Sequence, residues 1–146
     1  SLADTLVSMR VAHFLPLVSR VRFYGRRKAK VDMPLFPGYV FLKGTREQAF
    51  DADRTNRVAR IIDVPDQQQI NDELQSLWLA LNHDQPLDPY PYLREGIRVV
   101  VRSGPLRGMQ GLIESRASRD RLVLQVHVLG QASSLEIDPS LLEPIE

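Results

Sequence analysis

The side chains that most often carry enzymatic chemistry are sparse in this sequence and lie far apart. The three histidines are His13, His83 and His127, and none stands at the spacing of a metal-binding pair or of a nucleophile motif. Asp51 and Asp53 are close in sequence, but residues two apart on a helix point to different faces and do not share a substrate. The sequence has no cysteine, which removes thiolate chemistry. We therefore predict a protein with no catalytic residue, no metal site and no cofactor.

The glycine-containing segment Ser103–Gly111 resembles a phosphate-binding loop only superficially. It lacks the Lys-Ser/Thr pair of a nucleoside-triphosphate loop and the G-x-G-x-x-G order of a dinucleotide site, and the pattern after it is that of a strand. Positive φ in a β-turn and close backbone approach at a corner of a sheet explain its glycines better. We interpret the segment as structural.

Positive charge gathers in one part of the chain. The 146 residues carry 19 Lys and Arg and 18 Asp and Glu, for a net charge of +1. Between Asp4 and Asp32 there is no acid, whereas this window holds Arg10, Arg20, Arg22, Arg26, Arg27, Lys28 and Lys30. Such a cluster is typical of nucleic-acid binding, and it fits a solvated hairpin with charged edges equally well.

Length and proline content predict two small domains. No apolar run approaches the roughly 18 residues of a membrane span, and Ser1–Arg10 has no signal-peptide pattern, so a soluble, cytoplasmic protein is expected. Three prolines in six residues, Pro86, Pro89 and Pro91, disfavour both helix and sheet. We therefore expect a first domain at 1–82, a Pro-rich linker at 83–95 and a second domain at 96–146.

Helix and strand signals are mixed in residues 1–82. Residues 14–24 alternate between the two faces of a strand, and a turn at 25–27 with a second arm at Lys28–Met33 makes a hairpin. The mixture predicts an α+β domain with helices packed on an antiparallel sheet. The other expected elements are a helix with Leu2, Leu6 and Met9, strands at Tyr39–Lys43 and Val58–Val64, a helix with a capping box at Thr45–Gln48, and a helix capped by Asn71 or Asp72 with Leu74, Leu77, Trp78 and Leu81 in the core.

The C-terminal part shows strand patterns alone. Short strands are expected at about 97–102, 109–116, 121–128, 133–137 and 141–145. Five short strands in about 50 residues favour a small closed barrel, because closure removes exposed strand edges.

Two stretches resemble the NusG family of transcription elongation and antitermination factors. Pro34-Leu-Phe-Pro-Gly-Tyr-Val-Phe-Leu42 is similar to the signature segment of the family's N-terminal (NGN) domain. Val99-Val-Val-Arg-Ser-Gly104-Pro-Leu-Arg-Gly108, Gly111 and Val126-His-Val-Leu-Gly130 are similar to its KOW domain. The resemblance implies an NGN domain at 1–82, lacking the strand that precedes the first helix in the family, and a five-stranded, SH3-like KOW barrel at 96–146.

The resemblance further implies a monomeric, non-catalytic factor that binds RNA polymerase. Its N-terminal domain would contact the clamp helices of the largest polymerase subunit, its hairpin would face upstream DNA or nascent RNA, and its KOW domain would recruit Rho or a ribosomal protein. From the residues alone, Phe36 and Tyr39 are either anchors for a partner or parts of the core. The implied sites are Phe36, Pro37, Tyr39 and Phe41 for polymerase, Arg20, Arg22, Arg26, Arg27 and Lys28 for nucleic acid, and Val128, Leu129 and Gly130 for the KOW partner.

Some features depart from the common family pattern. Leu129 and Gln131 replace the aromatic and arginine residues of many housekeeping members, which puts recruitment of Rho or a ribosomal protein in doubt. Phe14-Leu-Pro-Leu with the basic hairpin resembles specialised, operon-specific paralogues. The net effect on pausing, termination or antitermination stays open. The alternative function is a ribosomal or RNA-binding KOW module, although residues 83–146 carry 7 bases and 9 acids and are therefore acidic.

Overall fold

The computed structural model describes residues 1–145 and divides into two compact units, Ser1–Asp63 and Val64–Glu146. Glu146, the last residue of the expected second domain, lies outside the described residues. The third helix and the Pro-rich segment 83–95 belong to the second unit. The compact units therefore divide the chain earlier than the expected limit after residue 82, and the family domain limits stay a prediction. No helix in the described part is long and apolar enough to cross a membrane.

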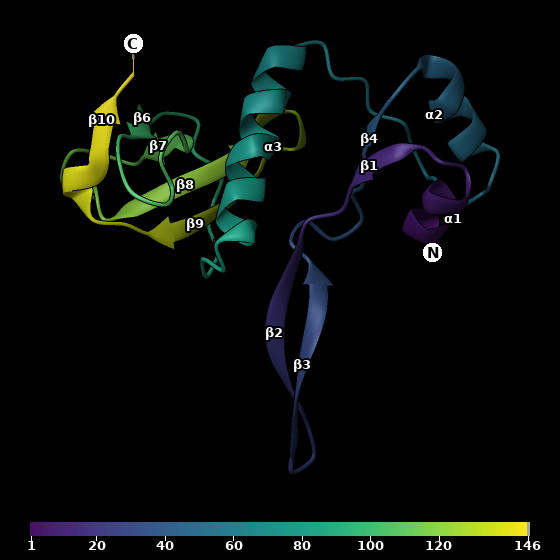
Figure 1. The fold of residues 1–146 in the computed structure, drawn as a ribbon, viewed down its shortest axis with the longest axis horizontal. Helices are drawn as coiled ribbons and strands as arrows, with labels where there is room; N and C mark the ends of the chain where they lie inside the picture. Colours follow the sequence, from purple (N-terminus) through teal and green to yellow (C-terminus); the bar gives the residue numbers. More distant parts are fainter. Residues whose placement is uncertain (146) are drawn as a thin grey trace. The chain divides into compact units, whose positions relative to one another are not determined.

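The first unit combines two helices with two separate pairs of antiparallel strands (Figure 1). The expected α+β character is confirmed, but the strands form two ribbons instead of one sheet. Leu6, Val11 and Ala52 form a small core between the helices and the shorter ribbon. The elements are α1 (Leu2–Ser8), β1 (Ala12–Phe14) paired with β4 (Phe41–Lys43), β2 (Leu17–Tyr24) paired with β3 (Arg27–Pro34), and α2 (Arg46–Asp53).

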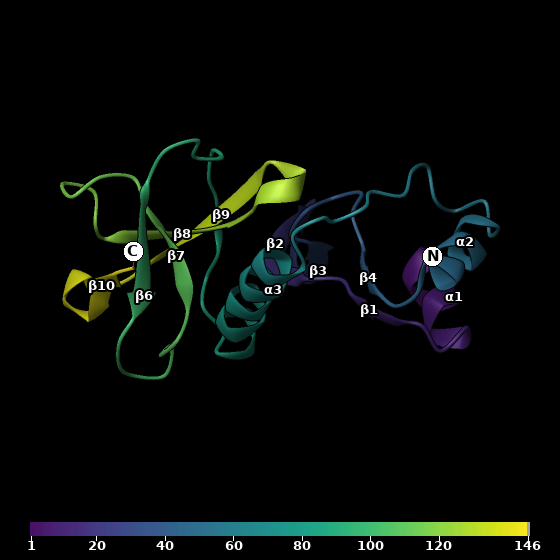
Figure 2. The same cartoon turned by 90° about the horizontal axis from the view of Figure 1, so that it is seen from above.

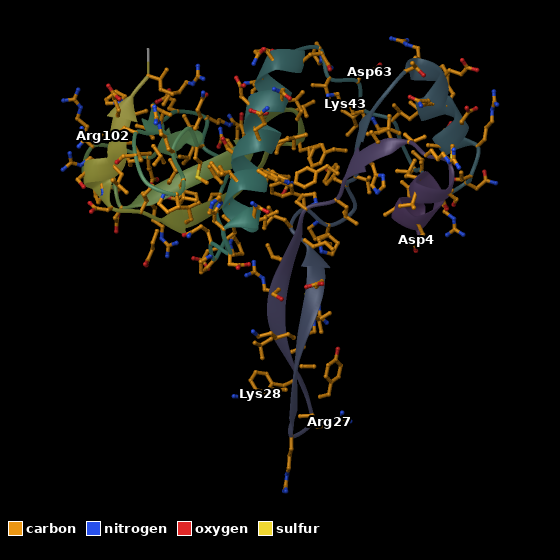
Figure 3. All side chains as sticks on the ribbon, viewed as in Figure 1. Asp4, Arg27, Lys28, Lys43, Asp63 and Arg102 are labelled. Carbon is orange, nitrogen blue, oxygen red and sulfur yellow. The ribbon has the colours of Figure 1, made fainter. Side chains whose placement is uncertain are left out.

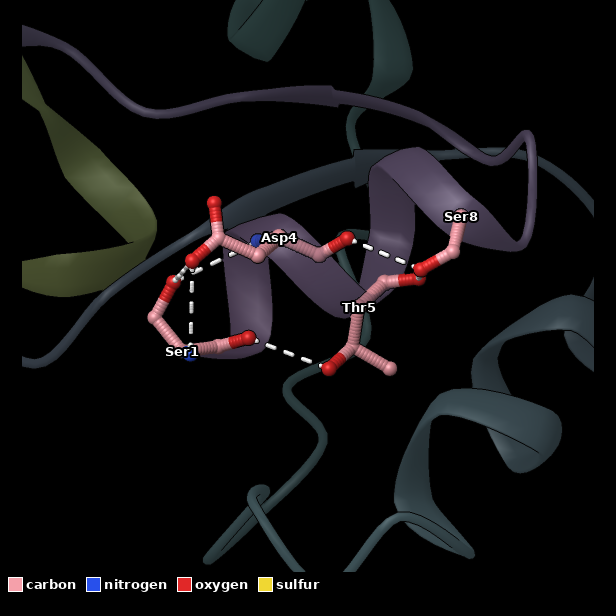
Figure 4. Close-up of polar contacts among 4 residues, drawn as sticks. All are labelled: Ser1, Asp4, Thr5 and Ser8. Atoms are coloured by element: carbon pink, nitrogen blue, oxygen red, sulfur yellow. Dashed lines mark hydrogen bonds and ion pairs between the residues drawn. The ribbon is translucent and has the colours of Figure 1, made fainter.

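Both helices of this unit begin with a capping box, in which two backbone donors of the first turn find side-chain acceptors. In α1 the Ser1 hydroxyl accepts from the Asp4 N–H at 3.3 Å and donates to the Asp4 carboxylate at 2.8 Å (Figure 4). In α2 the Gln48 N–H donates to the Thr45 hydroxyl at 3.2 Å, and the Thr45 N–H donates to the Gln48 side-chain oxygen at 2.9 Å. The capping box expected at Thr45–Gln48 is confirmed.

The strand expected at Val58–Val64 is wrong. These residues form no strand and pair with no strand in the described part of the chain. Ile61 and Ile62 are each 37% exposed. β-Branched side chains favour a strand only where they can pack on a pleated, half-buried surface. Because β1 and β4 pair only with each other, neither offers an edge to residues 58–64.

The second unit is one helix on a six-stranded antiparallel sheet. The helix α3 (Gln67–Asn82) packs against β7 and β8 (Figure 2). The strand order is β10-β6-β7-β8-β9-β5. The strands are β5 (Asp88–Pro89), β6 (Ile97–Val101), β7 (Gln110–Ile113), β8 (Arg121–Val126), β9 (Gln131–Glu136) and β10 (Leu142–Pro144), with short 3-10 turns at His127–Leu129 and Pro139–Leu141. All five expected strands are present, within a few residues of their expected limits.

The expected closed barrel is wrong, because this sheet is open and has two edges. Its edge strands are β5 and β10, and each contains a proline, Pro89 and Pro144. Proline has no N–H to donate, so it ends a ladder and protects an exposed edge from further pairing. The edges are thus protected without closure.

The Pro-rich segment lies along the sheet within the second unit. Leu87 is buried, and β5 pairs with β9. The Ser133 hydroxyl donates to the Asp88 carbonyl at 2.9 Å. Gln125 then binds both backbone groups of Leu93, at 3.1 and 3.2 Å. The segment is therefore held by backbone and side-chain hydrogen bonds from the neighbouring strands.

The register of α3 differs from the expected one. Asp66 is the N-cap and accepts from the Gln69 N–H at 2.9 Å, so the helix begins before Asn71 and Asp72. Ser76, Leu77 and Ala80 are buried, whereas Trp78, expected in the core, is 55% exposed. The Ser76 hydroxyl accepts from the Gln110 N–H of β7 at 3.0 Å. The buried face of α3 therefore keeps Leu77 of the expected stripe but includes Ser76 and Ala80 in place of Trp78.

Gly111 in β7 lies where the backbone of β8 comes close. A Cβ at this position would sit 2.6 Å from the Val123 carbonyl oxygen. We therefore expect Gly111→Ala to lower the free energy of unfolding by about 1–3 kcal/mol, measured by urea denaturation of the full chain. Gly130→Asn is the control, since its Cβ meets no atom and asparagine tolerates its φ of 62°. Equal stability of the two variants would contradict this packing.

Candidate functional site

The bend at residues 36–39 is built by glycine and a backbone hydrogen bond. The Tyr39 N–H donates to the Phe36 carbonyl at 3.2 Å, and Gly38 between them has a φ of 88°. Nearly all L side chains avoid this conformation. The bend is a tight turn between β3 and β4, and the four predicted polymerase-binding residues lie in it or next to it.

These four residues differ in their exposure. Phe36 is buried, with 3% of its surface exposed, so its ring is not available to a partner in this structure. Pro37 is exposed, and Tyr39 and Phe41 are partly exposed. Phe41 packs on Phe14 of the paired strand, with ring centroids 6.3 Å apart. The surface that a partner can reach is therefore Pro37, Tyr39 and the exposed part of Phe41, while Phe36 lies in the interior.

The predicted nucleic-acid residues lie on one ribbon. Eight residue pairs join β2 to β3, from Leu17↔Pro34 to Tyr24↔Arg27, and the ribbon extends away from β1 and β4 (Figure 1). Every residue from Val21 to Lys28 is exposed. Arg27 and Lys28 lie at its far end (Figure 3). The ribbon brings together the predicted set Arg20, Arg22, Arg26, Arg27 and Lys28, and Arg20 is the partly buried member.

The predicted KOW partner residues form a tight turn after β8. Val128 and Leu129 lie in the 3-10 turn His127–Leu129, and Gly130 closes it in the left-handed conformation with a φ of 62°. Both apolar side chains are partly exposed. The preceding His127 is held on both sides, because its N–H donates to the Glu73 carboxylate at 3.0 Å and its ring binds the Tyr92 hydroxyl. The turn is therefore fixed from α3 and from the Pro-rich segment.

The described residues contain no group of three or more His, Cys, Asp or Glu that could hold a metal ion, and Arg121 forms ion pairs with Asp88 at 2.8 Å and Glu136 at 3.5 Å. His13 and His83 each bind a nearby backbone carbonyl, and Asp51 pairs with Arg54 at 3.0 Å. An open hollow of about 360 Å³ beside α3 has Asp72 and Arg107 as the titratable residues of its lining. These histidines and Asp51 thus have local structural partners.

Sequence reasoning missed the exposed rings of the ribbon. Phe23 and Tyr24 are 68% and 58% exposed, and Lys30 stands beside them on β3. The alternation predicted a strand but not which of its rings would be exposed. Val18 near the base of the ribbon is buried, whereas every residue from Val21 to Lys28 is exposed. The sequence signal that could have predicted the exposure of the two rings is the number of Arg and Lys residues before and after Phe23 and Tyr24.

Part of the chain matches a known protein family. The family described as "Transcription termination factor nusG" matches residues 1–76, slightly more than half of the 146 residues. The matched stretch contains the basic ribbon and the bend, and it ends inside α3. The chain matches no curated protein.

The Glu73 carboxyl has an altered titration. Burial raises its pKa above the ordinary value, and the hydrogen bond from the His127 N–H acts in the opposite direction. A folded protein with a raised carboxyl pKa binds more protons than the unfolded chain between the two pKa values. Glu73 therefore makes the second unit less stable as the pH rises through that window.

We expect Glu73→Gln to weaken this loss of stability as the pH rises above the ordinary glutamate pKa, because the amide keeps an acceptor for the His127 N–H but carries no charge. Glu73→Ala removes the acceptor and should cost about 1 kcal/mol across the same range. Urea denaturation at several pH values measures both. A glutamine variant less stable than wild type at pH 7 would contradict the account.

Proposed function

Because the chain belongs to the NusG family of transcription factors, we propose that it binds RNA polymerase through its N-terminal part and modulates pausing, termination or antitermination. The family's members are non-catalytic, in agreement with the scattered acids and histidines of this chain. The observation that carries the proposal is the family match over residues 1–76, which includes the bend and the ribbon.

The proposed polymerase surface is the exposed part of the bend, whereas Phe36 lies in the interior. Pro37 and Tyr39 are reachable, and the Phe14–Phe41 contact holds the strand that follows. Aromatic residues on a rigid backbone carry much of the binding energy of protein interfaces, because little conformational freedom is lost on contact. The helical surface of the polymerase clamp is the partner that the family resemblance implies.

The basic ribbon is proposed to contact upstream DNA or nascent RNA. Its outer half carries Arg22, Arg26, Arg27, Lys28 and Lys30, and the nearest acid on the ribbon is Asp32 near its base. Phosphate contacts by such residues release counterions, so the affinity should fall steeply with salt. This contact would orient the factor on a transcribing polymerase.

The C-terminal unit is proposed to recruit a further partner through the turn at Val128, Leu129 and Gly130. The partly exposed apolar side chains there lie on a turn held by Glu73 and Tyr92. Rho or a ribosomal protein is the class of partner that the resemblance implies. We propose a KOW-type domain for residues 96–146 and a monomeric protein, general or operon-specific.

The alternative proposal is an RNA-binding KOW-type module. Exposed arginines of the second unit, Arg98, Arg102 and Arg107, favour it. The excess of acids over bases in residues 83–146 opposes it, because RNA-binding domains are usually basic. Titration of the full chain with structured RNA distinguishes the two, if the ribbon cations are first replaced by glutamine. Retained salt-dependent binding in that variant would support the alternative.

For the polymerase surface, Tyr39→Ala should weaken binding of the cognate RNA polymerase about tenfold or more, because it removes a ring at the proposed interface. Phe50→Ala is the matched control, since Phe50 is an exposed ring, 51% accessible, on α2. Binding is measured by titration of the fluorescently labelled full chain with polymerase. Equal affinity of Tyr39→Ala and wild type would reject this surface.

A further inference from the structure

We infer that the tip of the β2–β3 ribbon binds single-stranded nucleic acid by stacking unpaired bases on Phe23 and Tyr24. This inference rests on the proposed nucleic-acid contact of the ribbon and adds to it the form of the ligand and two new binding residues. Both rings are largely exposed, 68% for Phe23 and 58% for Tyr24. An exposed aromatic ring beside a cation is the element from which single-strand binding sites are built.

The ladder register puts one ring and one cation together on each face of the ribbon. Phe23 stands directly opposite Lys28, and Tyr24 stands directly opposite Arg27. Directly opposite residues share a face, whereas neighbours along a strand point to opposite faces. Phe23 with Lys28 therefore occupies one face, and Tyr24 with Arg27 occupies the other.

The same pairing continues one step toward the base of the ribbon. Lys30 stands opposite Val21 on the face of Phe23, and Arg22 stands opposite Ala29 on the face of Tyr24. On the Phe23 face the second cation, Lys30, lies two residues along β3 from Lys28, a spacing of about 7 Å. On the Tyr24 face Arg22 of β2 lies diagonally across from Arg27 of β3, at about 7–8 Å. These distances are near that between successive phosphates of a nucleic-acid strand, so a backbone can follow the cations while a base covers the ring.

One side of the Phe23 ring already has a cation. The Lys28 ammonium lies 5.6 Å from the ring centroid. This cation–π contact favours one orientation of the ring relative to the ammonium. It leaves the opposite side of the ring for a base and keeps the ammonium near the attached phosphate. Tyr24 offers a second ring at the next residue, on the other face.

The arrangement fits a single strand better than a duplex. A two-stranded ribbon can enter the major groove, where one face reads base edges through polar side chains. Here each face carries a ring instead, and a ring can stack on a paired base only by unstacking the duplex, at a cost of a few kcal/mol. A flexible single strand passes around the tip and reaches both faces. DNA and RNA share this chemistry.

The test is fluorescence anisotropy with the full chain and three labelled ligands, which are a dT12 strand, an rU12 strand and a 12-base-pair duplex. Wild type should bind at least one single strand more tightly than the duplex. Phe23→Ala and Tyr24→Ala should each weaken that binding about tenfold and leave its salt dependence unchanged. Arg27→Gln should reduce the salt slope by about 0.7, because a phosphate contact is lost.

Two control variants separate stacking from other effects. Phe23→Leu keeps the apolar bulk without the flat ring and should behave like Phe23→Ala, and Phe50→Ala should bind as wild type does. If the alanine variants bind as wild type while Arg27→Gln is impaired, the stacking inference fails and the phosphate contact of the proposed function survives. If wild type binds none of the three ligands, both fail, while polymerase binding through Tyr39 is judged by its own titration.

Discussion

Backbone hydrogen bonding at strand edges is the constraint on which both units depend. Each peptide group of a strand needs a partner, and in this chain the available partners decide where sheets end. In the first unit β2 and β3 satisfy each other over eight residue pairs and stop there. In the second unit each edge strand contains a proline, which limits further pairing. Ser76 accepts a hydrogen bond from the N–H of Gln110 in β7, and Glu73 accepts one from the N–H of His127. An open sheet and an uncovered ribbon are the results.

The contacts that we propose use three exposed parts of the chain, which are the ribbon, the bend before β4 and the turn after His127. Because no layer covers the ribbon within the first unit, its cations and rings are presented together, as a polyanion with exposed bases requires. Because Gly38 bends the chain sharply before β4, Pro37 and Tyr39 stand at the surface while Phe36 is buried. Because His127 is bound from two sides, the turn after it has a defined shape. Each proposed contact thus uses side chains on a rigid backbone.

Local patterns predicted most of the elements. The hairpin, the Thr45 capping box and the five C-terminal strands depend on alternation, turn residues and caps within a few residues of one another, and the structure contains them. Errors arose where a distant partner decided the outcome. Val58–Val64 lacks a strand to pair with, and α3 turns Ser76 toward the N–H of Gln110 and Trp78 toward solvent. The C-terminal sheet stays open, and one of its edge strands contains Pro89, which the sequence analysis assigned to a linker. Among the site residues, the exposure of the cations was foreseeable from charge, whereas for Phe36 the sequence left a core position and a partner contact as alternatives, and the structure shows it buried.

The central claim is that this chain acts on a transcribing RNA polymerase without chemistry of its own. Single-round transcription in vitro with the cognate polymerase tests it most directly, by measuring pause lifetimes and terminator read-through with and without the full chain. The account predicts a concentration-dependent change in these quantities that saturates as the polymerase is bound. Identical pause lifetimes and read-through at saturating protein would contradict it.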